Sequence, residues 1–443
     1  MGLRDLPLRA TAARPRVLVV ALPGATRVRL AAEQELRRRD LPTAPTPAQA
    51  DLLLVAGPDC PALADAVDRL WQDMPAPRAR AQVRTADEVA AVIGSARAAL
   101  ATPPPRTGAE DRHARSTDRH PRGGHRHGGG GGESHGGTEH PTGTEHRTGH
   151  EGHRGHGGGM EMPAGLPTAE RGPDRDGLAL DRLHVSFGPF LPDWPAGLTI
   201  RLTLQGDVIQ HAALVEPAPS GAATALPYWS EPWMRAAAGQ DIHAGDAARR
   251  RAAAHLDSLG RFLAVAGWPT EATAARRLRD DLLAEAPEAT GATEVPEAPQ
   301  LRGARSADLR RRAERFARRV GRSRTLHWLT RGMGNLTRAE AEAAGVSGPA
   351  ARADGDVPAR YRQWLTAVLD DIARLEHPGL LDPAGAEGPR GRPDGPRSAS
   401  TALAAALPRL LEGTEVAAAR LIVASLDPDP DELAALLPEA ARG

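Results

Sequence analysis

The sequence predicts a small α/β domain and a mainly α-helical α+β domain, joined by a disordered segment. Two apolar runs, Arg16–Leu22 and Asp51–Gly57, are separated by residues with helical spacing. A His- and Gly-rich tract without apolar periodicity occupies the middle of the chain, and an alternating pattern followed by helical periodicity comes after it. We therefore expect domains at 15–100 and 163–443 with a linker at 101–162.

The first domain is predicted to contain a doubly wound parallel sheet. Continuous apolar runs that end at Gly or Pro are typical of parallel strands buried on both faces. Helical spacing follows each run, and residues 80–83 (RAQV) are a candidate third strand. Alternating strands and helices of this kind favour a parallel sheet covered by helices.

The second domain is predicted to begin with a β-hairpin unit. Residues Leu198–Leu204 alternate between apolar and polar, 205–207 (QGD) form a turn, and Val208–Leu214 return. From Asp246 onward the apolar residues recur mostly with helical spacing.

Composition excludes several classes of protein. The 443 residues carry 56 cationic and 56 acidic side chains, which gives no electrostatic case for nucleic-acid binding or for a polybasic membrane anchor. Cys60 is the only cysteine, so a disulfide framework, a Cys₄ zinc site and a self-contained iron–sulfur cluster are excluded. No apolar run approaches the roughly 20 residues of a membrane helix, and none resembles a signal-peptide core. We expect a cytoplasmic protein, at most peripheral on the inner face of the cell membrane.

The middle tract is the candidate metal site. Imidazole suits Ni²⁺ and Zn²⁺, but a chain without a scaffold would bind these ions weakly and with poor selectivity. Three hypotheses stand: an inert linker, a weak metal buffer, and a dedicated nickel-delivery segment. The candidate ligands are His125, His127, His135, His140, His146, His150, His153 and His156.

Outside this tract, single residues have structural interpretations. We expect Cys60 to be a small buried residue at the start of a helix. The remaining histidines have no metal-ligand spacing. We expect core or interface anchors at Trp194, Trp229, Trp233, Trp268, Trp328 and Trp364.

Residues 51–83 resemble the small, cluster-bearing subunit of the bacterial NADH–quinone oxidoreductase (complex I) family. That family has a buried strand, a helix and a Met-Pro turn at this spacing. The matching residues are Asp51, Val55, Ala56, Gly57, Leu70, Trp71, Asp73, Met74, Pro75 and Pro77.

The second half resembles the hydrogenase-derived large subunit of the same family in three ordered segments. The first segment matches at Gly188, Pro189, Pro192, Gly197, Arg201, Leu202, Leu204, Gly206, Asp207 and Val208. The second matches at Arg331, Gly332, Gly334, Gly345, Ser347, Gly348, Pro349, Arg352 and Gly355. The third, 410–433, resembles the family's ending. The resemblance thus implies a natural fusion of two subunits that are neighbours in the family's complex.

The redox residues that the resemblance would imply are missing. The family's small subunit binds its cluster through a cysteine pair after the first strand and two later cysteines, whereas Leu22–Val28 contains none. In the family's large subunit two histidines line the quinone site; here the first position is Leu191, and the second falls within Asp193–Ala196. The matched positions are therefore those expected to shape the fold, and the residues that would bind the redox groups are absent.

Matched positions of the large-subunit motifs are the candidate cofactor-binding residues. For the Gly–Pro pairs two interpretations stay open: turn geometry, or contact with a quinone or another ligand. For Arg352 they are a surface ion pair, or a bidentate contact with a cofactor or partner carboxylate. The candidates are Gly188, Pro189, Gly197, Arg331, Gly348, Pro349, Arg352 and Gly355.

The resemblance implies a subunit-like or accessory component of a complex I-like assembly, without an iron–sulfur cluster and not catalytic alone. Its expected partners are complex I-like or antiporter-like membrane subunits, through which it would reach the membrane. One alternative is a nickel- or zinc-binding accessory protein for a hydrogenase or complex I-like client, with the His tract as its function. Another is quinone binding without a cluster, with electrons supplied by another protein.

Overall fold

A computed structural model describes residues 13–101, 170–173, 179–218, 226–284, 299–382, 387–393, 395 and 397–435. The described residues before 103 and after 168 belong to one compact unit. The predicted linker and its eight candidate histidine ligands lie outside the described residues. The domain boundaries therefore stay a prediction.

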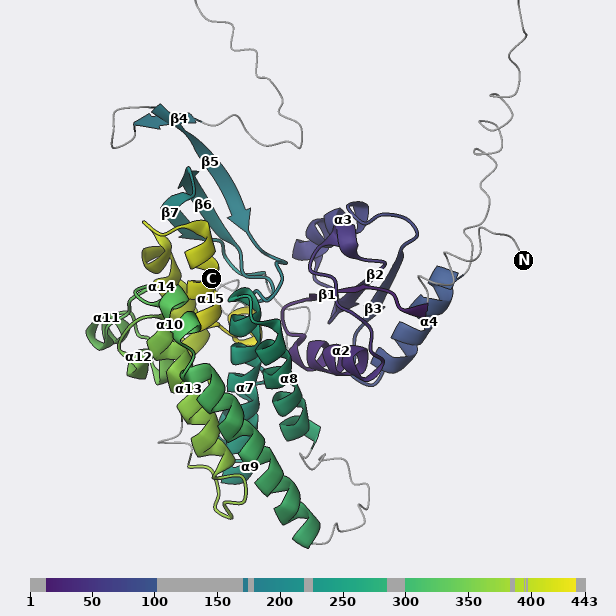
Figure 1. Ribbon diagram of the computed structural model, residues 1–443, viewed down its shortest axis with the longest axis vertical. Coiled ribbons are helices and arrows are strands. Elements are labelled where there is room, and N and C mark those ends of the chain that lie inside the picture. The colour runs from purple at the N-terminus through teal and green to yellow at the C-terminus, as the bar shows by residue number, and fades with distance from the viewer. Residues whose placement is uncertain are drawn as a thin grey trace, which may run out of the picture. The chain divides into compact units, whose positions relative to one another are not determined.

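The N-terminal part is a three-stranded parallel sheet in the order β1-β2-β3, as predicted (Figure 1). The strands are β1 (Val17–Ala21), β2 (Leu52–Ala56) and β3 (Ala79–Val83). All five residues of β2 are buried, because helices cover both faces of the sheet. The helices are α2 (Thr26–Arg38), η1 (Pro47–Gln49), η2 (Pro61–Leu63), α3 (Ala64–Gln72) and α4 (Val89–Ala101).

Alternate residues of β2 face two different apolar clusters. Leu52 and Leu54 pack in one cluster with side chains of α2 and α4. Leu53 and Val55 pack in the other with Cys60 and with residues of η2 and α3. The doubly wound arrangement predicted from the continuous apolar runs is therefore confirmed. Cys60 is 6% exposed and precedes η2, as expected for a small buried residue.

The C-terminal part begins with an antiparallel sheet in the order β4-β5-β6-β7. Its strands are β4 (Glu170–Pro173), β5 (Ala179–Phe187), β6 (Ile200–Gln205) and β7 (Val208–Leu214). The β6–β7 pair is the predicted hairpin, and Gly206 in its turn has a φ of +63°. The long loop between β5 and β6 contains residues 188–197, the first motif of the second half.

Helices form most of the remainder, as the apolar spacing predicted. Their cores share one cluster with the inward side chains of β6 and β7. Residues 410–433, the third segment of the resemblance, include the end of one helix and two further helices. The helices are α6 (Glu231–Ala237), α7 (Ala244–Val265), α8 (Pro269–Ala284), α9 (Pro299–Gly321), α10 (Arg324–Thr330), α11 (Arg338–Ala343), α12 (Gly348–Ala353), α13 (Val357–Ile372), α14 (Ala399–Leu411), α15 (Val416–Leu426) and α16 (Pro430–Ala435).

Helix α7 is the centre of the helical core. It packs along α8 and α13, and the ring of Phe262 stacks on Tyr361 of α13 at 5.3 Å between centroids. Of the tryptophans predicted to be anchors, Trp194, Trp229, Trp233 and Trp364 are buried. Trp328 is 66% exposed, so it is no part of this chain's core. Among the described helices, none is both long enough and apolar enough to cross a membrane.

Candidate functional site

The β5–β6 loop is fixed by contacts between its own residues. Trp194 is 8% exposed and donates from Nε1 to the carbonyl oxygen of Leu198 at 2.7 Å. Its ring meets Phe187 edge-on. Gly188 has a φ of +96°, and a Cβ at this position would lie 2.0 Å from the Leu198 oxygen. Backbone geometry therefore requires glycine at position 188.

Gly197 brings the loop against the N-terminal part of the unit. Its φ is +77°, and a Cβ there would lie 2.6 Å from Cγ of Pro23 and 3.9 Å from Cδ1 of Leu63. Pro23 follows β1, in the loop where the small-subunit family has its cysteine pair. The two loops that the resemblance singles out, one from each half of the sequence, are thus in direct contact.

A cavity of about 450 Å³ lies beside these loops. Its wall includes Leu18–Ala21 of β1, the following Leu22, and the loop residues Pro189–Trp194. Leu191, at the position of the family's first quinone histidine, is therefore on the cavity wall. The charged side chains of the lining include Arg29, Glu33, Asp193, Arg261, Arg276 and Asp431.

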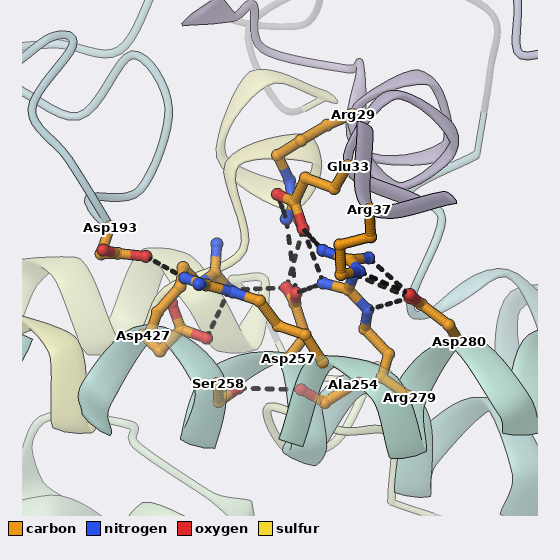
Figure 2. Close-up of polar contacts among 12 residues, drawn as sticks. Arg29, Glu33, Arg37, Asp193, Ala254, Asp257, Ser258, Arg279, Asp280 and Asp427 are labelled. Carbon is orange, nitrogen blue, oxygen red and sulfur yellow. Dashed lines mark hydrogen bonds and ion pairs between the residues drawn. The ribbon is translucent and has the colours of Figure 1, made fainter. Parts of the chain in front are cut away.

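A buried network of ion pairs adjoins the cavity and joins α2 to α7 and α8 (Figure 2). Asp257 of α7 accepts from Nη2 of Arg29 at 2.7 Å and from Nη1 of Arg279 at 2.5 Å. Glu33 of α2 accepts from Nη1 of Arg29 at 2.6 Å and from Nη1 of Arg279 at 2.9 Å. The side chains of Asp257 and Arg279 are 1% and 0% exposed. Each half of the sequence therefore contributes one acid and one guanidinium group to this ring of four charges.

Further pairs extend this network on both sides. Asp280 of α8 accepts from Arg37 of α2 and from the guanidinium of Arg279. On the other side, Arg261 of α7 lies 3.2 Å from Asp257 and donates to Asp427 at 2.7 Å. Asp427 follows α15, so a third segment of the chain joins the same set of charges.

The central acids are ionised at neutral pH. Burial alone would raise the pKa of Glu33 and of Asp257, because a low-dielectric surrounding disfavours the charged form. Arg29 and Arg279 outweigh burial at Glu33, and they do so together with Arg261 at Asp257. Both pKa values lie well below the ordinary range. These groups act as fixed charges and not as proton donors.

Two acids on the cavity wall behave in the opposite way. Burial raises the pKa of Asp193, against the opposing effect of Arg276, whose Nη2 lies 2.5 Å from Oδ1. Burial also raises the pKa of Asp431, although hydrogen bonds with Thr26 oppose it. The cavity therefore combines apolar walls with carboxyl groups that hold a proton more tightly than in water.

The structure brings only some of the predicted site residues together. Gly188, Pro189 and Gly197 belong to the cavity loop, and Pro189 is in the cavity lining. Gly348 and Pro349 begin α12, where a Cβ on Gly348 would lie 2.6 Å from Cα of Gly391. This position serves close packing of two backbone segments, which agrees with the turn-geometry interpretation.

The other predicted positions have individual roles. Arg352 forms an ion pair with Glu387, as the surface interpretation predicted. The carbonyl oxygen of Gly355 accepts from Nη1 of the buried Arg360 at 3.0 Å. Arg331 follows α10 and is exposed. None of these three residues is in the lining of the cavity.

The donors present do not fit an iron–sulfur cluster. A cluster needs several thiolates, and Cys60 is the sole cysteine of the sequence. Burial raises the pKa of its thiol, which favours the protonated form. Ala25, in the loop after β1, is 1% exposed and lies against Gly57. Within the described ranges there is also no group of three or more His, Cys, Asp or Glu residues able to hold a metal ion.

Sequence reasoning missed the ion network. In the sequence these charges are indistinguishable from ordinary surface charges of amphipathic helices. Each ion pair between the two halves joins residues more than 200 positions apart, as in Arg29–Asp257 and Glu33–Arg279. Asp257 carried a usable signal. It interrupts the apolar stretch of α7, and an acid in a helix buried on all sides needs a cationic partner.

Comparison with known proteins gives distant structural similarities only. No protein-family model matches the chain, and no curated protein matches it. The fold is similar to a chain in the structure of a membrane-bound sulfane sulfur reductase, an archaeal respiratory membrane complex. The similarity covers 57% of this chain and 98% of that chain, at 17% identity and a TM-score of 0.46. A similarity of this size establishes neither family nor function.

Proposed function

We propose that this protein is a structural component of a complex I-like respiratory assembly, in which two subunit-like modules are held together within one chain. The modules are 15–100 and 163–443, and the segment between them is a tether. The chain would contribute shape and binding surfaces and no cluster of its own. Catalysis would belong to its partners.

The observation that carries this proposal is the Arg29–Asp257–Arg279–Glu33 network. The network specifies how the two modules dock, because docking with a wrong charge at this interface would bury an ion without a counter-ion, which costs several kcal/mol. Modules with this interface are expected to work in the docked state. The tether raises their effective concentration, so docking needs no assembly factor.

The cavity is consistent with a lost redox role. The side chain of Leu191 can form no hydrogen bond at the position where the resemblance implies a histidine, and the nearby Asp193 is paired with Arg276. We therefore expect no quinone chemistry from this chain alone. Photoaffinity labelling with a quinone analogue tests this expectation, and saturable labelling of the loop 188–197 would favour the alternative of quinone binding without a cluster.

The docked state can be tested with the intact chain. A protease recognition sequence inserted within 123–159 would allow the tether to be cut without altering any described residue. After cleavage, the two halves are expected to elute together in size-exclusion chromatography. The variant Asp257→Arg places three cations against one acid, so its halves are expected to separate.

Asp370→Arg is the matched control. Asp370 is exposed on α13 and has no ion pair among the described residues. The halves of this variant should remain together. If the wild-type halves separate as readily as those of Asp257→Arg, the docked-module proposal is wrong.

The assembly can be tested by affinity purification of the intact chain from solubilised membranes. Complex I-like or antiporter-like membrane subunits are expected among the recovered proteins. Their absence would contradict the proposal. If a chain lacking 123–159 loses both tight nickel or zinc binding and biological activity, the metal-accessory alternative replaces it.

A further inference from the structure

Helix α9 has a row of arginines on the side opposite its buried residues. The buried stripe comprises Leu309, Ala313, Phe316 and Val320. The exposed residues at spacings of four, three and four along the chain are Arg311, Arg315 and Arg318 of the helix and Arg322 directly after it, whose backbone N–H donates to the carbonyl oxygen of Arg318. A helix places residues with this spacing on one face, so these guanidinium groups follow one line along the surface.

The segment 305–331 is strongly basic although the whole chain is neutral. It contains ten arginines and only two acids, Asp308 and Glu314. Six of the arginines have no salt bridge to any residue that the structure describes. These are Arg310, Arg315, Arg318, Arg322, Arg324 and Arg331.

Helix α10 adds two exposed apolar side chains directly after this row. Trp328 is 66% exposed and Leu329 is 39% exposed. Arg324, four residues before Trp328, is on the same face of the helix, and exposed Arg331 directly follows the last residue of the helix. Buried Leu326 fixes the opposite face. The indole therefore projects outward between two cations.

We infer that this basic–Trp surface, formed by Arg315, Arg318, Arg322, Arg324, Trp328 and Arg331, binds the surface of an anionic phospholipid bilayer. Arginines near such a surface are attracted by its negative potential, and tryptophan favours the boundary between headgroups and acyl chains. Leu329 adds apolar area beside the indole. Contact with lipid would be direct, in addition to any contact through membrane subunits.

The arrangement favours a lipid surface over an acidic protein. Protein interfaces seat their aromatic anchors in closely packed pockets with a complementary shape. Here one indole projects from a short helix, and cations without a salt bridge to any described residue extend along the exposed face of the preceding helix. A row of this kind matches a diffuse layer of negative charge, which needs no fixed partner geometry.

The test is co-sedimentation of the intact chain with vesicles. Vesicles of phosphatidylcholine mixed with phosphatidylglycerol should bind the protein, and vesicles of pure phosphatidylcholine should bind it weakly. At about pH 8 most histidines are neutral, so the His-rich tract contributes little charge. Added salt should reduce binding, because it screens exposed charges beyond roughly 10 Å at 0.1 M.

Two variants examine the charged and apolar parts separately. Replacing Arg315, Arg318 and Arg322 together with Gln should weaken binding to the mixed vesicles roughly 100-fold. Trp328→Ala should weaken it roughly 10-fold, and Trp328→Phe should retain most of it. These side chains are exposed, so the unfolding midpoint of each variant should stay close to that of the wild type.

The control removes the same charge elsewhere. Arg27, Arg69 and Arg201 are exposed and have no salt bridge within the described part of the chain, and their replacement with Gln should leave vesicle binding nearly unchanged. Equal losses in the two triple variants would overturn the proposal. So would failure of the intact chain to bind anionic vesicles, or capture by soluble polyglutamate with an affinity equal to that for the vesicles.

Discussion

Arg29 donates to both carboxylate oxygens of Asp257, to Oδ2 at 2.7 Å and to Oδ1 at 3.3 Å, across 228 positions of sequence. The two residues come from α2 and α7, which belong to different halves of the chain. Asp257 is 1% exposed and Arg29 is 14% exposed, so water screens this pair little. The contact makes α2 and α7 parts of one charged interface.

Removing the acid of this pair should destabilise the protein strongly. In Asp257→Ala the two buried guanidinium groups of Arg29 and Arg279 share only one acid of the ring, Glu33. Breaking a buried pair by removing one partner costs about 3–5 kcal/mol. Urea unfolding followed by circular dichroism measures this loss. Asp308→Ala, which breaks an exposed pair with Arg311, should cost at most about 1 kcal/mol, and equal losses would contradict the assignment.

The cavity loop should tolerate no side chain at Gly188. Gly188→Ala combines a positive φ with a contact of 2.0 Å to the Leu198 oxygen, so the loop backbone must move. We expect a loss of more than about 2 kcal/mol in unfolding free energy. Gly206→Ala is the matched control, because Gly206 also has a positive φ but has nothing within 4 Å of its added Cβ. A cost at Gly188 no larger than that at Gly206 would exclude the packing explanation.

Stability should depend on pH through Asp429, which is fully buried after α15. Burial and the nearby carboxylates of Asp431 and Glu432 raise its pKa well above the ordinary 3.8. Because the folded pKa is the higher one, the stability that the proton confers is complete below pH 3.8 and is lost as pH rises through the folded pKa.

Asn at position 429 resembles the protonated acid and cannot ionise. The stability of Asp429→Asn relative to the wild type should therefore increase as the pH rises from about 5 to about 8. Each unit by which the folded pKa of Asp429 exceeds the unfolded pKa corresponds to about 1.4 kcal/mol. Unfolding free energies at the two pH values give the comparison. If the unfolding free energy of the variant instead falls relative to that of the wild type at the higher pH, Asp429 is stabilised as a carboxylate.

Cys60 should react slowly in the folded protein. The thiol is 6% exposed and burial raises its pKa, so both access and thiolate fraction are low. Titration with a thiol-reactive chromophore at about pH 8 should show one slow equivalent in buffer and one fast equivalent in denaturant. Fast modification of the folded protein would contradict the burial of η2 against β2.

Much of the fold follows from local pattern. Continuous apolar residues at Val17–Ala21 and Leu52–Ala56 predict parallel strands, because only strands covered on both faces need no polar side. Alternation around Gly206 predicts the hairpin, and helical spacing predicts the helices after Asp246. Trp328 could not be placed in this way, since an indole is equally suited to a core or to an exposed binding surface.

The sequence by itself determined the classes of structure and the lack of cysteine ligands for a cluster, whereas the need for glycine at position 188 follows from its contact with the Leu198 oxygen in the structure. The tertiary structure alone decided which charges meet. Arg29, Glu33, Asp257 and Arg279 have no local signature as a set, because an ion pair depends on distance in space and on exclusion of water. Both arise only when α2 packs against α7 and α8.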